Sequence, residues 1–203
     1  MKITNVTSQI VKVTIEDPEL LAKTFIRFQE YYESPEFRNK IFTLGQFKDW
    51  YSKKYGAFTY YSDWDGFNIP SHVLQPFVKG LFDPLTDEEK NMLECFKYRS
   101  DKFYIIGVSE DSGDTLDHEI CHGLYHTNDE YNGAVNKVLT AHAKDLSSIY
   151  DFLKRKGYSP AVWKDEANAY IANNYDYLID EGVQVNKTLH NKLSILRGKV
   201  DGI

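Results

Sequence analysis

The chain has 203 residues, of which 42% are hydrophobic and 27% are charged, and its formal net charge is −6. A chain of this length can bury a core without disulfide or metal cross-links, so we expect a single soluble globular domain over residues 1–203. The negative charge argues against nucleic acid as a partner, because phosphate binding requires a basic surface.

The sequence has no signal for secretion or for a membrane. Residues 1–18 lack the apolar segment of a signal peptide, and no apolar run approaches the length of a membrane span. The two cysteines, Cys95 and Cys121, are too few for a disulfide framework. We therefore expect a cytoplasmic protein without a membrane partner. The sequence does not indicate its oligomeric state.

The first half of the chain is predicted to be mostly helical. Alternating apolar and polar residues predict a strand at 10–15. Asp17 and Pro18 then supply an N-cap and a first-turn proline for a helix that continues to about Glu33. Other elements expected in this part include a short helix after Ser34-Pro35, helices at 46–54, 72–82 and 86–98, a strand at 57–61 and a loop at 62–71.

The second half carries the clearest strand signal, KFYIIGV at 102–108. A polar segment at 109–114 leads from this strand into a predicted helix over about 114–124. Further helices are expected at 128–138, at 149–156, after Ser159-Pro160 and at 188–197. These patterns predict an α+β fold that is mostly helical and has a small sheet.

Residues 118–122 read His-Glu-Ile-Cys-His, which is the H-E-x-x-H pattern. On a helix, the imidazoles of His118 and His122 lie one turn apart on the same face. Two nitrogens so placed can share one metal ion, and Glu119 can reach a water molecule on that ion. The pattern therefore predicts a hydrolase with one Zn²⁺ per chain.

The motif and its flanks resemble the zincin superfamily of metallopeptidases. That superfamily has Val or Thr three residues before the first His, uncharged residues inside the motif and a hydrophobic residue two positions after the second His. The residues that match these positions are Thr115, Ile120, Cys121 and Leu124. The resemblance covers about residues 102–126.

The resemblance implies a zincin-like fold and a role for each matching residue. His118 and His122 would be zinc ligands, and Glu119 would be the general base. The strand at 102–108 would be the edge strand that pairs with an extended peptide substrate, immediately before the active-site helix at about 114–124. In this arrangement residues 1–100 form a helical N-terminal part with the loop at 62–71. Residues 101–180 then carry the edge strand, the active-site helix and the helix of the third ligand.

His126 is one candidate for the third ligand, because it continues the series of histidines at intervals of four. On a continuous helix, however, His118 and His126 are about 12 Å apart along the axis. They could share one ion only if the helix broke at Gly123. Zincins with a third histidine place it six residues after the second, and that position is Asn128 here.

Glu166 is the candidate that we favour as third ligand. It lies in a stripe of aromatic and aliphatic residues on the helix after Ser159-Pro160, where a carboxylate pairs, protonates or binds a metal. A downstream helical glutamate as ligand resembles the gluzincin branch. That branch often has Asp four residues after the glutamate, and Tyr170 stands there in this chain. Asp165 and His126 stay open as alternatives.

A tyrosine or histidine near the metal often donates a hydrogen bond to the developing oxyanion. Four residues could serve here, namely Tyr125, His126, Tyr131 and Tyr170. We predict Tyr170 as the second catalytic residue beside Glu119.

These residues together predict a zinc-dependent metallopeptidase that cleaves a peptide or protein substrate through a metal-activated water. Two alternatives stay open. One is the same chemistry on a non-peptide amide, and the other is a zincin-fold protein in which the metal is structural or serves only binding. A structural zinc is closed by four protein ligands, whereas a catalytic zinc keeps an open position. Because three ligands are easier to find here than four, catalysis is favoured.

Overall fold

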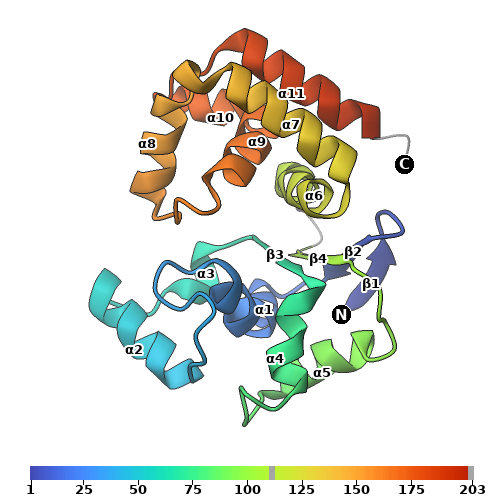
Figure 1. The fold of residues 1–203 in the computed structure, drawn as a ribbon. Helices are drawn as coiled ribbons and strands as arrows, with labels where there is room; N and C mark the ends of the chain where they lie inside the picture. The colour runs from blue at the N-terminus through green and yellow to red at the C-terminus, as the bar shows by residue number, and fades with distance from the viewer. Residues whose placement is uncertain (110–112, 201–203) are drawn as a thin grey trace. The chain divides into compact units, whose positions relative to one another are not determined.

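The computed structural model describes residues 1–109 and 113–200, apart from the side chains of Asp114 and Val200. Contacts divide the chain into two compact units, Met1–Ser112 and Gly113–Ile203, and each is described by itself (Figure 1). The predicted α+β class is confirmed, with many helices and one small sheet. The zincin-like arrangement stays a prediction. No helix in the described part of the chain is both long and apolar enough to cross a membrane.

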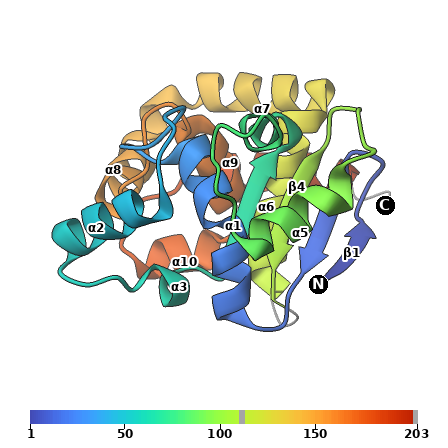
Figure 2. The ribbon, with the colours of Figure 1, turned by 90° about the horizontal axis from the view of Figure 1, so that it is seen from below.

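The first unit is built on a four-stranded mixed sheet in the order β1-β2-β4-β3 (Figure 2). Strand β1 (Lys2–Asn5) pairs antiparallel with β2 (Ile10–Thr14). Strand β4 (Tyr104–Val108) pairs parallel with β2 and antiparallel with β3 (Gly66–Pro70). The sheet therefore brings together three segments that are far apart in the sequence.

The prediction that the strand at 102–108 is an edge strand is wrong. Strand β4 pairs with β2 along one side and with β3 along the other. All five of its residues are buried, which is typical of a strand inside a sheet that is covered on its faces. A peptide substrate therefore cannot pair with β4 by adding a strand beside it.

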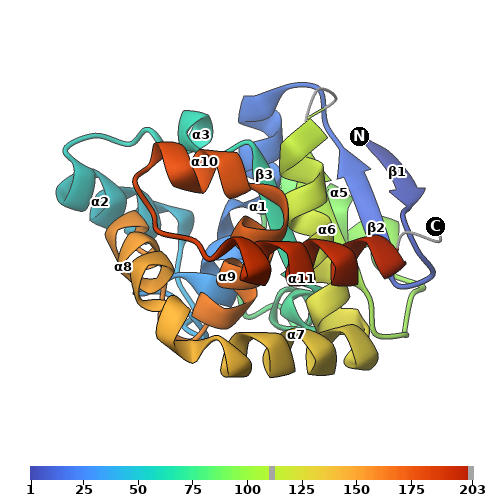
Figure 3. The same cartoon turned by 90° about the horizontal axis from the view of Figure 1, so that it is seen from above.

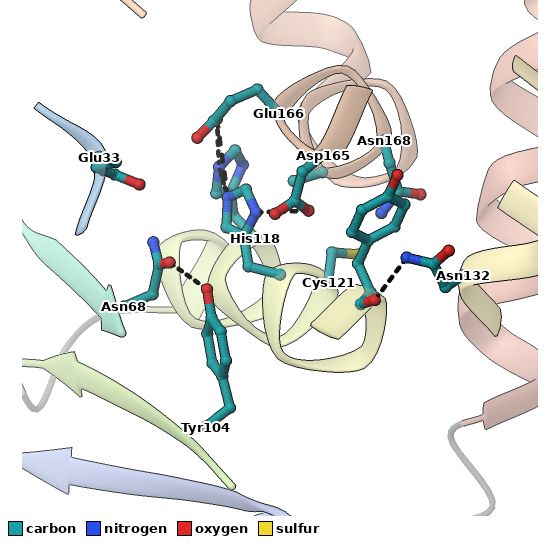
Figure 4. A network of polar contacts seen from close by, with 12 residues as sticks. Glu33, Asn68, Tyr104, His118, Cys121, Asn132, Asp165, Glu166 and Asn168 are labelled. Carbon is teal, nitrogen blue, oxygen red and sulfur yellow. Dashed lines mark hydrogen bonds and ion pairs between the residues drawn. The ribbon is translucent and has the colours of Figure 1, made fainter. Parts of the chain in front are cut away.

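Strand β3 forms one edge of the sheet, and part of that edge is already occupied. The backbone N–H of Asn68 donates to Oε1 of Gln29 at 3.0 Å, and Pro70 has no N–H to offer. The side chain of Asn68 accepts a hydrogen bond from the Tyr104 hydroxyl (Figure 4). The predicted loop at 62–71 is wrong over these strand residues, because Phe67 and Ile69 are buried in the core.

Helix α1 (Pro18–Glu33) packs against the sheet. As predicted, Asp17 caps it, accepting from the backbone N–H groups of Glu19 and Leu20. A Cβ at Gly107 of β4 would lie only 2.3 Å from the Phe25 ring of α1, so the close approach requires glycine there.

The other helices of the first unit are short. The predicted strand at 57–61 is wrong, because a helical turn begins at Tyr60. The helix predicted at 72–82 is shorter and begins with a 3₁₀ turn, η1. The bounds are α2 (Leu44–Tyr55), α3 (Tyr60–Asp63), η1 (Ser71–Leu74), α4 (Gln75–Val78) and α5 (Asp87–Phe96).

Glu30 of α1 makes the stability of the protein depend on pH. Burial raises the pKa of Glu30 from 4.5 to about 7, although hydrogen bonds with Tyr60 and Ser34 oppose the shift. The folded state holds the proton of Glu30 more tightly than the unfolded state does. The stability that this proton contributes is therefore lost as the pH rises from the pKa of Glu30 in the unfolded chain through its pKa in the folded chain. The loss is about 3 kcal/mol. We expect Glu30→Gln to be more stable than wild type at pH 8 but not at pH 4, as measured by denaturant unfolding.

Glu36→Gln is the matched control for this prediction, because Glu36 is exposed. Its stability should follow that of wild type at both pH values. If Glu30→Gln also followed wild type, Glu30 would titrate as an ordinary surface acid and the prediction would be wrong.

The second unit contains only helices among its described elements (Figure 3). Helix α9 lies at its centre, in contact with α6, α7, α8, α10 and α11. Its buried alanines, Ala167 and Ala169, allow the other helices to approach closely. The bounds are α6 (Gly113–Thr127), α7 (Asp129–Ala141), η2 (Ala143–Asp145), α8 (Ser147–Lys156), α9 (Trp163–Asn173), α10 (Tyr175–Asp180) and α11 (Lys187–Val200).

Most predicted helices of this unit are confirmed, but one begins later and is divided. The helix expected to start at Ser159-Pro160 begins at Trp163 instead. It ends at Asn173, and Asn174, whose φ and ψ are −112° and 37°, separates α9 from α10. This break matters for the site, because it places the Asn174 side chain at the end of α9.

Candidate metal centre

Helix α6 carries both histidines of the H-E-x-x-H pattern. The predicted helix is confirmed and continues without a break through Gly123 to Thr127. His118 and His122 lie one turn apart, and their Nε2 atoms are 3.1 Å from each other. His122 is 2% exposed, so its ring is held inside the unit.

Glu166 meets these two histidines from α9. Its Oε2 atom lies 3.7 Å from Nε2 of His118 and 3.7 Å from Nε2 of His122 (Figure 4). The three donor atoms all lie within 4.8 Å of one another, so this cluster could hold a metal ion. The packing of α9 on α6 thus brings together the three residues that the sequence predicts as ligands.

The second nitrogen of each ring has its own oxygen partner. Nδ1 of His118 lies 2.7 Å from Oδ1 of Asn174, and Nδ1 of His122 lies 2.9 Å from Oδ1 of Asp165. Asp165, an alternative third ligand in the sequence, therefore contacts the nitrogen that faces away from the cluster. Glu166 contacts the side of both rings where the Nε2 atoms lie.

The position of Glu166 fits a metal ion better than it fits hydrogen bonding to the two histidines. Oε2 of Glu166 is buried and has no hydrogen-bond partner among the described residues. Separations of 3.7 Å are too long for hydrogen bonds. Two ligand atoms on one tetrahedral zinc ion are about 3.3 Å apart, given bond lengths of about 2.0–2.1 Å. The observed separations lie close to that value.

The site carries more negative than positive charge. Burial alone would lower the pKa of His122, but Asp165, Glu166 and Glu119 together raise it well above 6.5. Burial also raises the pKa of Asp165, and His122 partly offsets that shift. A cation is the usual partner for buried carboxylates in excess. A proton on His122 and a metal ion would compete for the same place.

Glu119 and Tyr170 are the two predicted catalytic residues. Glu119 is 7% exposed, and its charge is close enough to raise the pKa of His122 and of Tyr170. The Tyr170 ring lies edge-on to His118, with 4.6 Å between the ring centroids. Its hydroxyl is 3.3 Å from the hydroxyl of Tyr158, a neighbour that the sequence did not reveal. Burial, with added contributions from Glu166 and Glu119, raises the pKa of Tyr170 above its usual 10, so this hydroxyl keeps its proton.

The other candidates from the sequence lie outside the cluster. His126 follows the ligands on the unbroken helix α6, so the axial distance keeps it from joining them. The Tyr131 hydroxyl donates to Asn168 at 3.1 Å, and the Tyr125 hydroxyl donates to Asn136 at 3.2 Å.

Comparison of the chain with protein-family models, with curated proteins and with solved structures finds no match. The site is thus defined by its own geometry, as a candidate centre for a single metal ion with two imidazole ligands and one carboxylate.

Proposed function

We propose that the protein is a zinc-dependent hydrolase and that it cleaves peptide bonds. His118, His122 and Glu166 hold the ion in this proposal. The observation that carries it is the Oε2 atom of Glu166, which is buried, lacks a hydrogen-bond partner among the described residues and faces two Nε2 atoms.

The number of ligands favours catalysis over a structural role. A structural zinc is closed by four protein ligands, whereas catalytic sites use three and keep one position open. Among the described residues the cluster has three donors. Asp165 and Asn174, the nearest further candidates, are engaged with the Nδ1 atoms instead.

The residues around the cluster support the proposal of hydrolysis. A bound zinc ion would supply Lewis acidity and lower the pKa of a water molecule. Glu119, which is buried on the same helix, would take the proton of the attacking water and deliver it to the leaving amine. Tyr170, which keeps its proton, would donate to the oxygen on which negative charge develops.

The peptide as substrate rests on the resemblance of the motif and its flanks to zincins. An edge strand that could pair with a peptide would have been separate support, but β4 lies inside the sheet and cannot provide it. A non-peptide amide would undergo the same chemistry, and a substrate screen separates the two classes.

The direct test is elemental analysis of the purified chain, followed by digestion of a peptide library with and without a chelator. We expect about one zinc per chain, cleavage that the chelator abolishes, and recovery when zinc is returned. Two histidines and one carboxylate also suit non-haem iron, so one iron per chain would overturn the proposal. So would the absence of any bound divalent metal at micromolar concentrations. A zinc-loaded protein that cleaves amides but no peptides would exclude the peptidase.

A further inference from the structure

We propose that Asp165 and Asn174 are positioning residues, which orient the two histidine rings so that both Nε2 atoms face one metal ion. This inference deepens the proposed function and rests on it. Neither residue belongs to the ligand cluster, and each acts through a histidine.

The chemistry of imidazole makes these partners necessary. A neutral histidine carries its hydrogen on one nitrogen and a lone pair on the other, and only the lone pair can bind a metal. An oxygen beside Nδ1 accepts a hydrogen bond from it, which fixes the hydrogen there and leaves Nε2 unprotonated. Oδ1 of Asn174 lies at hydrogen-bond distance from Nδ1 of His118, 2.7 Å. Oδ1 of Asp165 lies 2.9 Å from Nδ1 of His122 in an ion-pair contact.

The local structure explains how α9 supplies both partners. Asp165 and Glu166 are consecutive residues in its first turn, so one approaches Nδ1 of His122 while the other approaches Nε2. Asn174 follows the last residue of α9, and its own backbone N–H donates to the carbonyl of Tyr170 at 2.8 Å. One helix thus carries a ligand near its start and positions both rings from its two ends.

The two partners differ in charge, so substitutions at Asp165 and at Asn174 should change zinc affinity in different ways. Asp165 brings a negative charge that strengthens the donor nitrogen of His122, whereas Asn174 brings only a carbonyl oxygen. Loss of such a partner lowers metal affinity by about 10–100-fold. Asp165→Asn, which keeps an acceptor, should lose less affinity than Asp165→Ala. Asn174→Leu should lose affinity, and Asn174→Asp should keep or gain it.

The test uses the full chain and measures zinc affinity by competition with a chromophoric chelator. We expect Asp165→Ala and Asn174→Leu to bind zinc about 10–100-fold more weakly than wild type. Asp176→Ala is the matched control, because Asp176 is an exposed residue of α10. The visible spectrum of the cobalt-substituted protein should change in the first two variants and stay unchanged in the control. Wild-type affinity and an unchanged spectrum in both variants would overturn the inference.

Nitrogen-15 NMR of the histidine rings separates failure of this inference from failure of the proposed hydrolase. In the metal-free wild type, at a pH high enough for both rings to be neutral, we expect hydrogen on Nδ1 and none on Nε2 of both His118 and His122. Asp165→Asn should preserve it on His122, and Asp165→Ala should not. An unprotonated Nδ1 in wild type would overturn the inference whether or not the protein binds metal. If the affinities change as expected but nothing is hydrolysed, the positioning roles stand and the hydrolase proposal fails.

Discussion

Glu119→Gln is expected to keep the bound zinc and to lose hydrolysis by about 10²–10⁴-fold, the usual contribution of a general base. The substitution preserves the shape of a side chain that is only 7% exposed, so the packing of α6 should not change. The amide cannot take a proton from the attacking water, whereas the three ligands stay in place. The measurement is kcat/KM on the best-cleaved library peptide, together with zinc content.

Glu130→Gln provides the control for this substitution, because Glu130 is an exposed glutamate on the neighbouring helix α7. It should retain full activity. Undiminished hydrolysis by Glu119→Gln would exclude Glu119 as the base. Loss of zinc together with activity would show that Glu119 holds the site together instead.

Glu166→Ala is expected to weaken zinc binding by more than about 100-fold, beyond the range found for residues that only support a ligand. Glu166 is the single carboxylate of the cluster, and without it two imidazoles cannot hold the ion well. Glu166→Gln keeps the shape of this buried side chain while it removes the charge, so it separates loss of a ligand from loss of packing. We expect it to bind zinc more weakly than wild type as well.

His126→Ala is the comparison for the third ligand, because His126 lies on the same helix as the two ligand histidines. His126→Ala should reduce zinc retention far less than Glu166→Ala does. Circular dichroism checks that the Glu166→Ala protein is still folded. The reverse ranking would move the third ligand to His126 and contradict the geometry of the cluster.

The features that the sequence predicts well depend on short-range signals. His118 and His122 are one turn apart on a helix, and that spacing alone places both rings on one face. Glu166 could be predicted because a carboxylate in an apolar stripe requires a partner. Asp165 is only an alternative third ligand in the sequence, which could not show that it contacts Nδ1 of His122.

The features that the sequence does not predict depend on contacts between distant segments. Strand β4 is internal because β2 and β3 pair with it from both sides, and nothing within YIIGV distinguishes this from an edge. Strand β3 is misread as a loop, because Gly66, Asn68 and Pro70 resemble turn residues. Asn174 can contact His118 because α9 ends at Asn173, and a sequence of helix formers on both sides of Asn173-Asn174 predicts one continuous helix instead.

The placement of all the candidate site residues on α6, α9 and the end of α9 has a consequence for folding. The ligands His118 and Glu166 lie on α6 and α9, far apart in the chain, so an ion held between these helices would act as a cross-link across a long loop. Such a link opposes the disorder of the unfolded second unit, and the binding free energy adds to its folding free energy. At free zinc 100 times the dissociation constant, the gain is about 2.7 kcal/mol. Zinc supply would thus add to the stability that the second unit already gains from its buried apolar residues, such as Val135, Phe152 and Leu193.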